Sequence, residues 1–221
     1  NIRNQSPRYV PKTYTSIGVR RIKRVKYYAM NISQVKFGYT WRTSPKREYK
    51  LEPVSIDYLR LTETSPEFDD FLVNYPQVAQ SIEEQFIIGS ILSYTYSTNP
   101  RKKKLNTFYY NGTLDVAGNL INGIYRVAGP SKPDSAGPNT LLGTPYAQFT
   151  KLTNDLRYYI YFTEKKQIAT RLLAGIGSPY RNSEVLPYVK QYFAGGSQDM
   201  RAFYARSLGP GSYSPPDSLQ E

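Results

Sequence analysis

Apolar and polar side chains alternate along much of the chain, and this pattern restricts the fold more than any other feature of the sequence. Successive side chains of a β-strand point to opposite faces, so a sustained period of two predicts strands with one apolar and one polar face. The clearest segment is 149–162, whose apolar face carries Leu152, Leu156, Tyr158, Ile160 and Phe162. Its polar face carries Lys151, Thr153, Asp155 and Arg157.

Six further segments show the same alternation. They are 12–20, 34–41, 53–62, 86–98, 107–116 and 167–177. The chain is therefore predicted to be all-β, with about seven strands of about ten residues, the length that a tilted strand needs to cross a bilayer. Soluble sandwiches usually use strands of about 5–6 residues. Strand length favours an antiparallel transmembrane β-barrel over a soluble sandwich.

The connections between these segments differ in length in a regular way. Tight, basic turns at 44–47, 99–103 and 163–166 alternate with long connections at about 63–85, at about 117–145 and after 177. Outer-membrane barrels have short turns at one end and long loops at the other, which again favours the barrel. In the first long loop, Ser65-Pro66-Glu67 and Pro76 predict the starts of two short helices. The Gly- and Pro-rich segment 126–145 is predicted to be irregular.

The composition excludes most catalytic chemistry. The chain has no histidine and no cysteine, which removes histidine general bases, thiol nucleophiles, disulfides and the common zinc sites. We therefore expect neither an enzyme nor a bound metal or cofactor. No run approaches the roughly 18 apolar residues of a transmembrane helix. The first residue is Asn1 and no signal peptide is visible, which indicates a processed chain or a fragment.

The chain is strongly basic, with 29 Lys and Arg against 17 Asp and Glu and a net charge of +12. Together with 22 tyrosines, this keeps a soluble β module that binds nucleic acid as an alternative. The charges fall at turns and on polar strand faces, however, which favours solvated turns and a charged barrel lumen. A dense cluster consists of Arg20, Arg21, Lys23 and Arg24. On the long-loop side of a barrel, this cluster is predicted to contact the phosphates of lipopolysaccharide.

The stretch 186–210 carries the most specific pattern in the sequence. It is predicted to be a long aromatic loop whose Gly195-Gly196 tip can adopt positive φ. Arg201 stands among apolar residues, which favours a bidentate carboxylate partner. The stretch resembles the loop-six signature of the Omp85 superfamily, which includes the outer-membrane assembly factors BamA and TamA. The residues that match in order and spacing are Gly195, Gly196, Ser197, Met200, Arg201, Phe203, Leu208, Gly209 and Pro210, whereas Ala202 replaces the usual glycine.

The resemblance implies a domain organisation. Residues 1–177 would form part of a transmembrane barrel of about sixteen strands, with extracellular loops at about 63–85 and 117–145. Residues 178–221 would be loop six, which in the superfamily folds into the barrel lumen. There its arginine pairs with groups on the inner wall, a role that would fall to Arg201.

The resemblance also implies a function without chemical catalysis, which is to fold and insert β-barrel client proteins into a bacterial-type outer membrane. The implied partners are outer-membrane lipid and lipopolysaccharide, unfolded client proteins, accessory lipoproteins or periplasmic proteins, and the remaining barrel strands from the same or another chain. Nucleic acid is not among them. A secretion or translocation pore of the same superfamily is the alternative, because such members carry the same loop.

Overall fold

A computed structural model describes residues 9–24, 27–98, 106–128, 138–163, 166–196, 200–203, 206 and 208. The chain forms two compact units, Asn1–Tyr188 and Val189–Glu221. The first unit contains the strands and α-helices of the fold, and the second contains the loop that carries the Gly-Gly pair. None of the described helices is long and apolar enough to cross a membrane.

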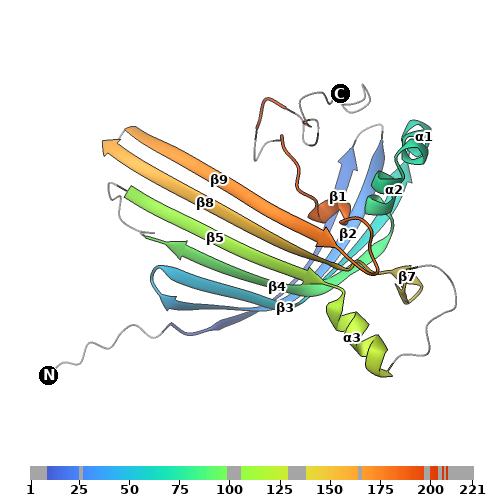
Figure 1. The fold of residues 1–221 in the computed structure, drawn as a ribbon, viewed down its shortest axis with the longest axis horizontal. Coiled ribbons are helices and arrows are strands. Elements are labelled where there is room, and N and C mark those ends of the chain that lie inside the picture. Colours follow the sequence, from blue (N-terminus) through green and yellow to red (C-terminus); the bar gives the residue numbers. More distant parts are fainter. Residues whose placement is uncertain are drawn as a thin grey trace. The chain divides into compact units, whose positions relative to one another are not determined.

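The first unit is built on a single antiparallel sheet with the order β1-β2-β3-β4-β5-β8-β9 (Figure 1). Its strands are β1 (Lys12–Arg24), β2 (Tyr28–Ser44), β3 (Arg47–Thr64), β4 (Gln85–Ser97), β5 (Asn106–Ala117), β8 (Phe149–Thr163) and β9 (Lys166–Pro179). The seven predicted strands are all present, and the all-β prediction is confirmed. Within the described residues, β1 and β9 each pair with one neighbour, so both strands form open edges of the sheet.

Two strands are much longer than the ten residues predicted for them. β2 has 17 residues and β3 has 18. β3 begins at Arg47, and the register between β3 and β4 shifts between Glu52 and Ser55. Pro53 lies in this irregular stretch, where its lack of an N–H group is tolerated, and its carbonyl accepts a hydrogen bond of 2.8 Å from the Ser90 hydroxyl. The bulge lets one long strand continue past a proline.

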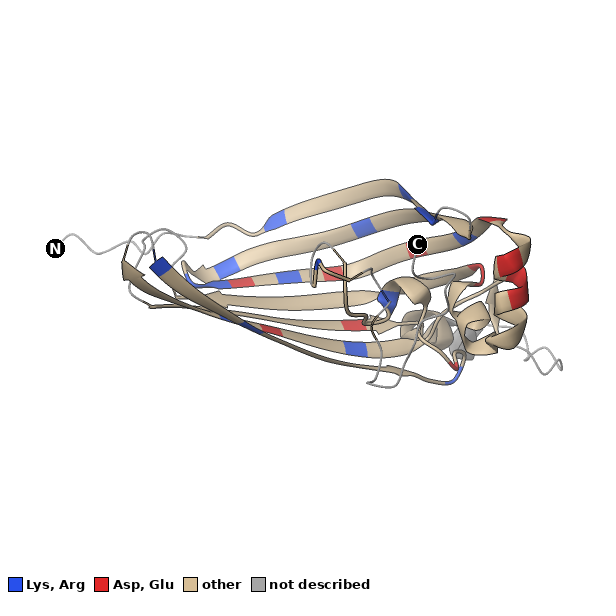
Figure 2. Ribbon diagram, turned by 90° about the horizontal axis from the view of Figure 1, so that it is seen from above, with Lys and Arg blue, Asp and Glu red and all other residues tan. Residues whose placement is uncertain are grey.

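The two faces of the sheet differ in chemistry, as the alternation predicts. We call them the apolar face and the polar face. Exposed apolar side chains on the apolar face come from every strand of the sheet, and they include Ile17, Val19, Val35, Val54, Leu92, Leu114, Leu152, Ile168, Leu172 and Ile176. Charged residues lie along the strands as well as at their ends (Figure 2). An exposed apolar surface of this extent is typical of contact with lipid.

The two ends of the sheet also differ. Short connections join β2 to β3, β4 to β5 and β8 to β9 at the turn end. The opposite end, the loop end, carries α1 (Pro66–Asn74), α2 (Pro76–Ile82), α3 (Asn119–Ala128) and a small hairpin of β6 (Thr140–Leu141) and β7 (Thr144–Pro145). The predicted helix starts at Pro66 and Pro76 are confirmed. The β1–β2 connection is short but lies at the loop end, so the strict alternation of short and long connections begins only after it.

The hydrophobic core of this unit lies at the loop end of the sheet. The Phe68 ring of α1 packs 5.0 Å from the Tyr28 ring, measured between centroids. The Ala147 N–H donates to the Phe86 carbonyl at 2.8 Å, which holds the connection before β8 against β4. The buried apolar residues include Tyr28, Ala29, Met30, Ile32, Leu59, Phe68, Ile82, Ile87, Ala117, Ile121, Tyr146, Ala147 and Phe149.

Candidate functional site

The segment after β9 is held to the loop-end core before it enters the second unit. The Tyr28 hydroxyl donates to the Tyr188 hydroxyl at 2.7 Å, and the two rings meet edge to face at 6.0 Å. The Leu186 side chain covers Gly177, because a Cβ atom at position 177 would lie 2.6 Å from a Leu186 methyl carbon. Pro187 is fully buried. The start of the long loop is therefore fixed by packing.

In the second unit, the Gly-Gly pair lies in a turn that backbone hydrogen bonds close. Gly195 and Gly196 have φ of 86° and 96°, which favour glycine over other residues. The Gly196 N–H donates to the Phe203 carbonyl at 2.9 Å, and the Arg206 N–H donates to the Ala194 carbonyl at 3.0 Å. The chain before the tip thus runs beside the chain after it, and the described motif residues Gly195, Gly196 and Met200–Phe203 lie in this turn.

The turn presents several motif side chains at its surface. Met200, Arg201, Ala202 and Phe203 are exposed, and Leu208 is half-buried. The remaining residues predicted for the motif, Ser197, Gly209 and Pro210, lie outside the described residues.

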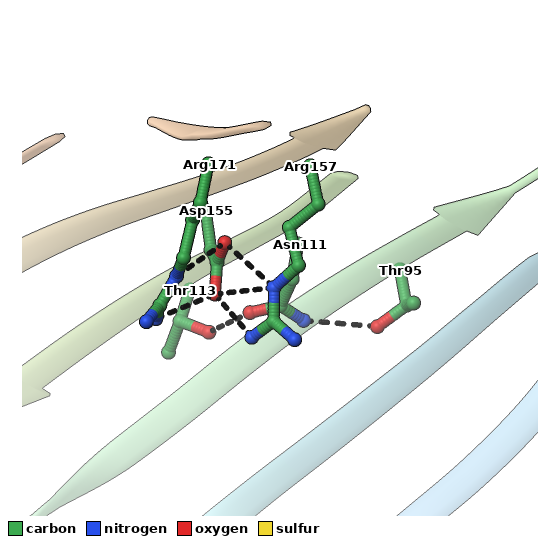
Figure 3. A network of polar contacts seen from close by, with 6 residues as sticks. All are labelled: Thr95, Asn111, Thr113, Asp155, Arg157 and Arg171. Atoms are coloured by element: carbon green, nitrogen blue, oxygen red, sulfur yellow. Dashed lines mark hydrogen bonds and ion pairs between the residues drawn. The ribbon is translucent and has the colours of Figure 1, made fainter. Parts of the chain in front are cut away.

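On the polar face of the sheet, Asp155 of β8 accepts hydrogen bonds from two arginines (Figure 3). Arg157 Nη2 lies 2.7 Å and Arg171 Nη2 lies 3.0 Å from Asp155 Oδ2. Beside them, the Asn111 amide of β5 donates to the Thr95 hydroxyl of β4 at 2.9 Å. These side-chain contacts join β8 to β9 and, separately, β4 to β5. One carboxylate faces two guanidinium groups, which leaves this part of the polar face with an excess of positive charge.

A second carboxylate, Glu52 of β3, is held in the same way by β1, β2 and β3. It is only 3% exposed. The Tyr14 hydroxyl donates to Glu52 Oε1 at 2.6 Å, and Lys50 Nζ lies 2.8 Å from the same oxygen. Lys36 Nζ lies 3.8 Å from Glu52 Oε2. A buried carboxylate requires such compensation, because desolvation of an unpaired charge costs several kcal/mol.

The basic cluster predicted to contact lipopolysaccharide divides between the two faces at the loop end. Arg21 and Lys23 lie on the apolar face and form ion pairs with Glu63 of β3, at 2.5 Å and 3.9 Å. Arg20 and Arg24 lie on the polar face. The Arg24 guanidinium carbon lies 5.8 Å from the centroid of the Tyr27 ring. The structure therefore brings two of the four cations together at the surface, and it places a carboxylate between them.

Sequence reasoning anticipated part of these arrangements. It placed Lys151, Asp155 and Arg157 on one polar strand face, but it did not pair Asp155 with Arg171, which comes from the next strand. It also did not identify the Glu52 network. Within the described residues, no group of three or more acidic side chains could hold a metal ion. Ion pairs on the polar face connect strands, and the turn in the second unit presents apolar side chains and one arginine.

A family model, the Omp85 superfamily domain, matches residues 21–219 of the chain. Neither a curated protein nor a solved structure matches it. Omp85 proteins are outer-membrane proteins, and they act as non-enzymatic assembly or translocation factors together with outer-membrane components and client proteins. The match covers most of the chain, including the six strands from β2 to β9 of the main sheet, the end of β1 and the glycine turn. This chain belongs to the Omp85 superfamily and is not an enzyme.

Proposed function

We propose that the chain is the central barrel section of an outer-membrane assembly factor, which folds β-barrel client proteins and inserts them into the outer membrane. The observation that supports this proposal is the closed glycine turn, which keeps the order of the loop-six motif and exposes Arg201. The apolar face fits the hydrocarbon core of a bilayer. In this proposal residues 1–177 form barrel wall with extracellular loops at 63–85 and 117–145, and residues 178–221 fold into the barrel lumen.

The experiment that tests the function uses the full-length protein in lipid vesicles. Unfolded client barrels are added, and the fraction that becomes folded is followed by the mobility of unheated samples on gels. Accelerated folding of clients supports an assembly factor. A protein that conducts ions or secretes a substrate, but leaves the rate of client folding unchanged, would instead be a translocation pore of the same family.

Replacement of Arg201 by alanine is expected to slow client insertion about tenfold, the effect of losing roughly 1.4 kcal/mol of a charge-assisted contact. Most strands should still form, because Arg201 lies outside the sheet. Circular dichroism checks the strand content, and the vesicle assay checks insertion. Arg181→Ala is the matched control, since Arg181 is also an exposed arginine outside the sheet. Wild-type insertion by the Arg201 variant would contradict the role.

We also propose that Arg20, Arg21, Lys23 and Arg24 contact lipopolysaccharide. The exposure of Arg21, whose side chain is 53% accessible, supports this proposal, and charge-assisted bonds to phosphate are the expected interaction. Replacement of Arg20, Arg21 and Arg24 by glutamate is expected to reduce the amount of lipopolysaccharide that copurifies with the full-length protein. Glutamate at Lys46 and Arg47, which lie at the turn end, is the control. Equal copurification in both variants would argue against the contact.

A further inference from the structure

Arg206 follows the exposed part of the turn, and none of the roles described above requires its side chain. Its backbone has φ of 68°, in the left-handed region that residues other than glycine rarely adopt. Such a conformation persists only where the surrounding contacts favour it strongly. The contacts of the Arg206 side chain and backbone therefore indicate its role.

Three contacts join Arg206 to the chain that precedes the glycine tip. Arg206 Nη1 donates to Gln191 Oε1 at 2.9 Å. Its guanidinium carbon lies 4.6 Å from the centroid of the Phe193 ring, within the range of a cation–π interaction. Its backbone N–H donates to the Ala194 carbonyl. A planar guanidinium can stack on a ring and donate in its plane at the same time, which a lysine ammonium cannot do.

We propose that Arg206 is a positioning residue, which fixes the shape of the loop-six turn and thereby the presentation of Arg201. The Gly196–Phe203 hydrogen bond closes the turn near its tip, and the Arg206 side chain joins the two arms of the turn further from the tip. Arg201 lies in the segment that both of these closures span. The two arginines thus differ in role. The Arg206 side chain links the two arms of the turn, whereas the Arg201 side chain is exposed. Only the link from this geometry to client insertion depends on the proposed function.

The test separates the guanidinium from the backbone conformation. Arg206→Gly removes the side chain but suits a positive φ better than arginine does, so a purely conformational role predicts no loss. We expect the reverse: hydrogen exchange of the amides at positions 196 and 206 should become about tenfold faster in the full-length protein, the effect of losing one charged hydrogen bond and one cation–π contact. Arg181→Gly is the matched control, because Arg181 also has positive φ, at 55°. It should leave these two amides unchanged.

A double-mutant cycle tests the specific contact. Phe193→Leu should accelerate the same amides, and the effects of Phe193→Leu and Arg206→Gly should not add, since both remove one shared interaction. Unchanged exchange in Arg206→Gly, or additive effects in the double variant, would overturn the proposal. Client insertion is then measured on the same variants and should fall with Arg206→Gly. If the wild-type protein inserts no clients, the proposed function fails while the exchange result still decides the role of Arg206 within the loop.

Discussion

Replacement of Gly89 by alanine is expected to lower the free energy of unfolding by about 3 kcal/mol, near the upper end of the usual cost of overpacking. A Cβ atom at this position would overlap the Val116 carbonyl oxygen and would lie 2.8 Å from the Ala117 Cα atom. Both are backbone atoms of the neighbouring strand β5, so no side-chain rotation can make room. The β4–β5 ladder would have to separate beside the loop-end core, where Ala117 is fully buried.

The measurement is the urea midpoint of the full-length protein in lipid vesicles, followed by the gel mobility of unheated samples. Gly18→Ala is the matched control. Gly18 also lies within a strand, but a Cβ atom there would have no neighbour within 4 Å. The control should therefore keep the midpoint of the wild type. Equal midpoints for both variants would show that the β4–β5 ladder is not as close at Gly89 as the structure has it.

Replacement of Glu52 by glutamine is expected to cost about 2 kcal/mol of stability, less than the 3–5 kcal/mol for breaking a fully buried pair, because solvent reaches Lys50. Glutamine has nearly the same shape and can still accept the Tyr14 hydrogen bond. It leaves Lys36 and Lys50 facing a neutral group, however, and both lie within 4 Å of the present carboxylate. The loss should therefore come from charge and not from packing. The urea midpoint in vesicles is again the measurement.

A second substitution distinguishes these causes. Lys50→Gln in the Glu52→Gln background removes one of the two uncompensated cations, so it should recover part of the lost stability. Glu48→Gln is the control, because Glu48 lies on the same strand but its ion pair with Arg42 is largely exposed. Exposed pairs contribute about 0–1 kcal/mol. A Glu48 variant as unstable as the Glu52 variant would contradict the importance of burial.

The strands could be predicted from the sequence because apolar side chains line one face of each strand and polar side chains line the other. Five predicted segments agree closely with β1, β4, β5, β8 and β9, and the two helix starts in the first long loop follow from Ser65, Pro66 and Pro76. Ser65 is indeed the N-cap, since its hydroxyl accepts a hydrogen bond from the Phe68 N–H at 3.2 Å. Local patterns of this kind need no knowledge of distant residues.

The parts that were missed depend on partners that lie elsewhere in the chain. Charged residues such as Glu48 and Lys50 did not indicate a strand. The opposite charges that pair with them on the polar face can be identified only when the strand register is known. Arg171 could not be assigned to Asp155 for the same reason. The helix α3 was not predicted, since Asn122-Gly123 resembles a turn and the segment lies in a Gly-rich connection. Arg206 lies between the motif residues Phe203 and Leu208, and its contacts with Gln191 and Phe193 could be identified only in the folded loop.

The hydrogen bond between Tyr28 and Tyr188 joins residues 160 positions apart, and this separation has a consequence for the order of folding. The strands of the main sheet each pair with the next main-sheet strand along the chain, so that hairpins can form from nearby segments and add to one another. Closing a loop of such length costs more conformational entropy than closing a turn, and contacts between distant residues form slowly. Tyr188 can therefore reach Tyr28 only after the intervening strands have brought the two ends of the first unit together. We expect this contact to form late in the folding of the first unit.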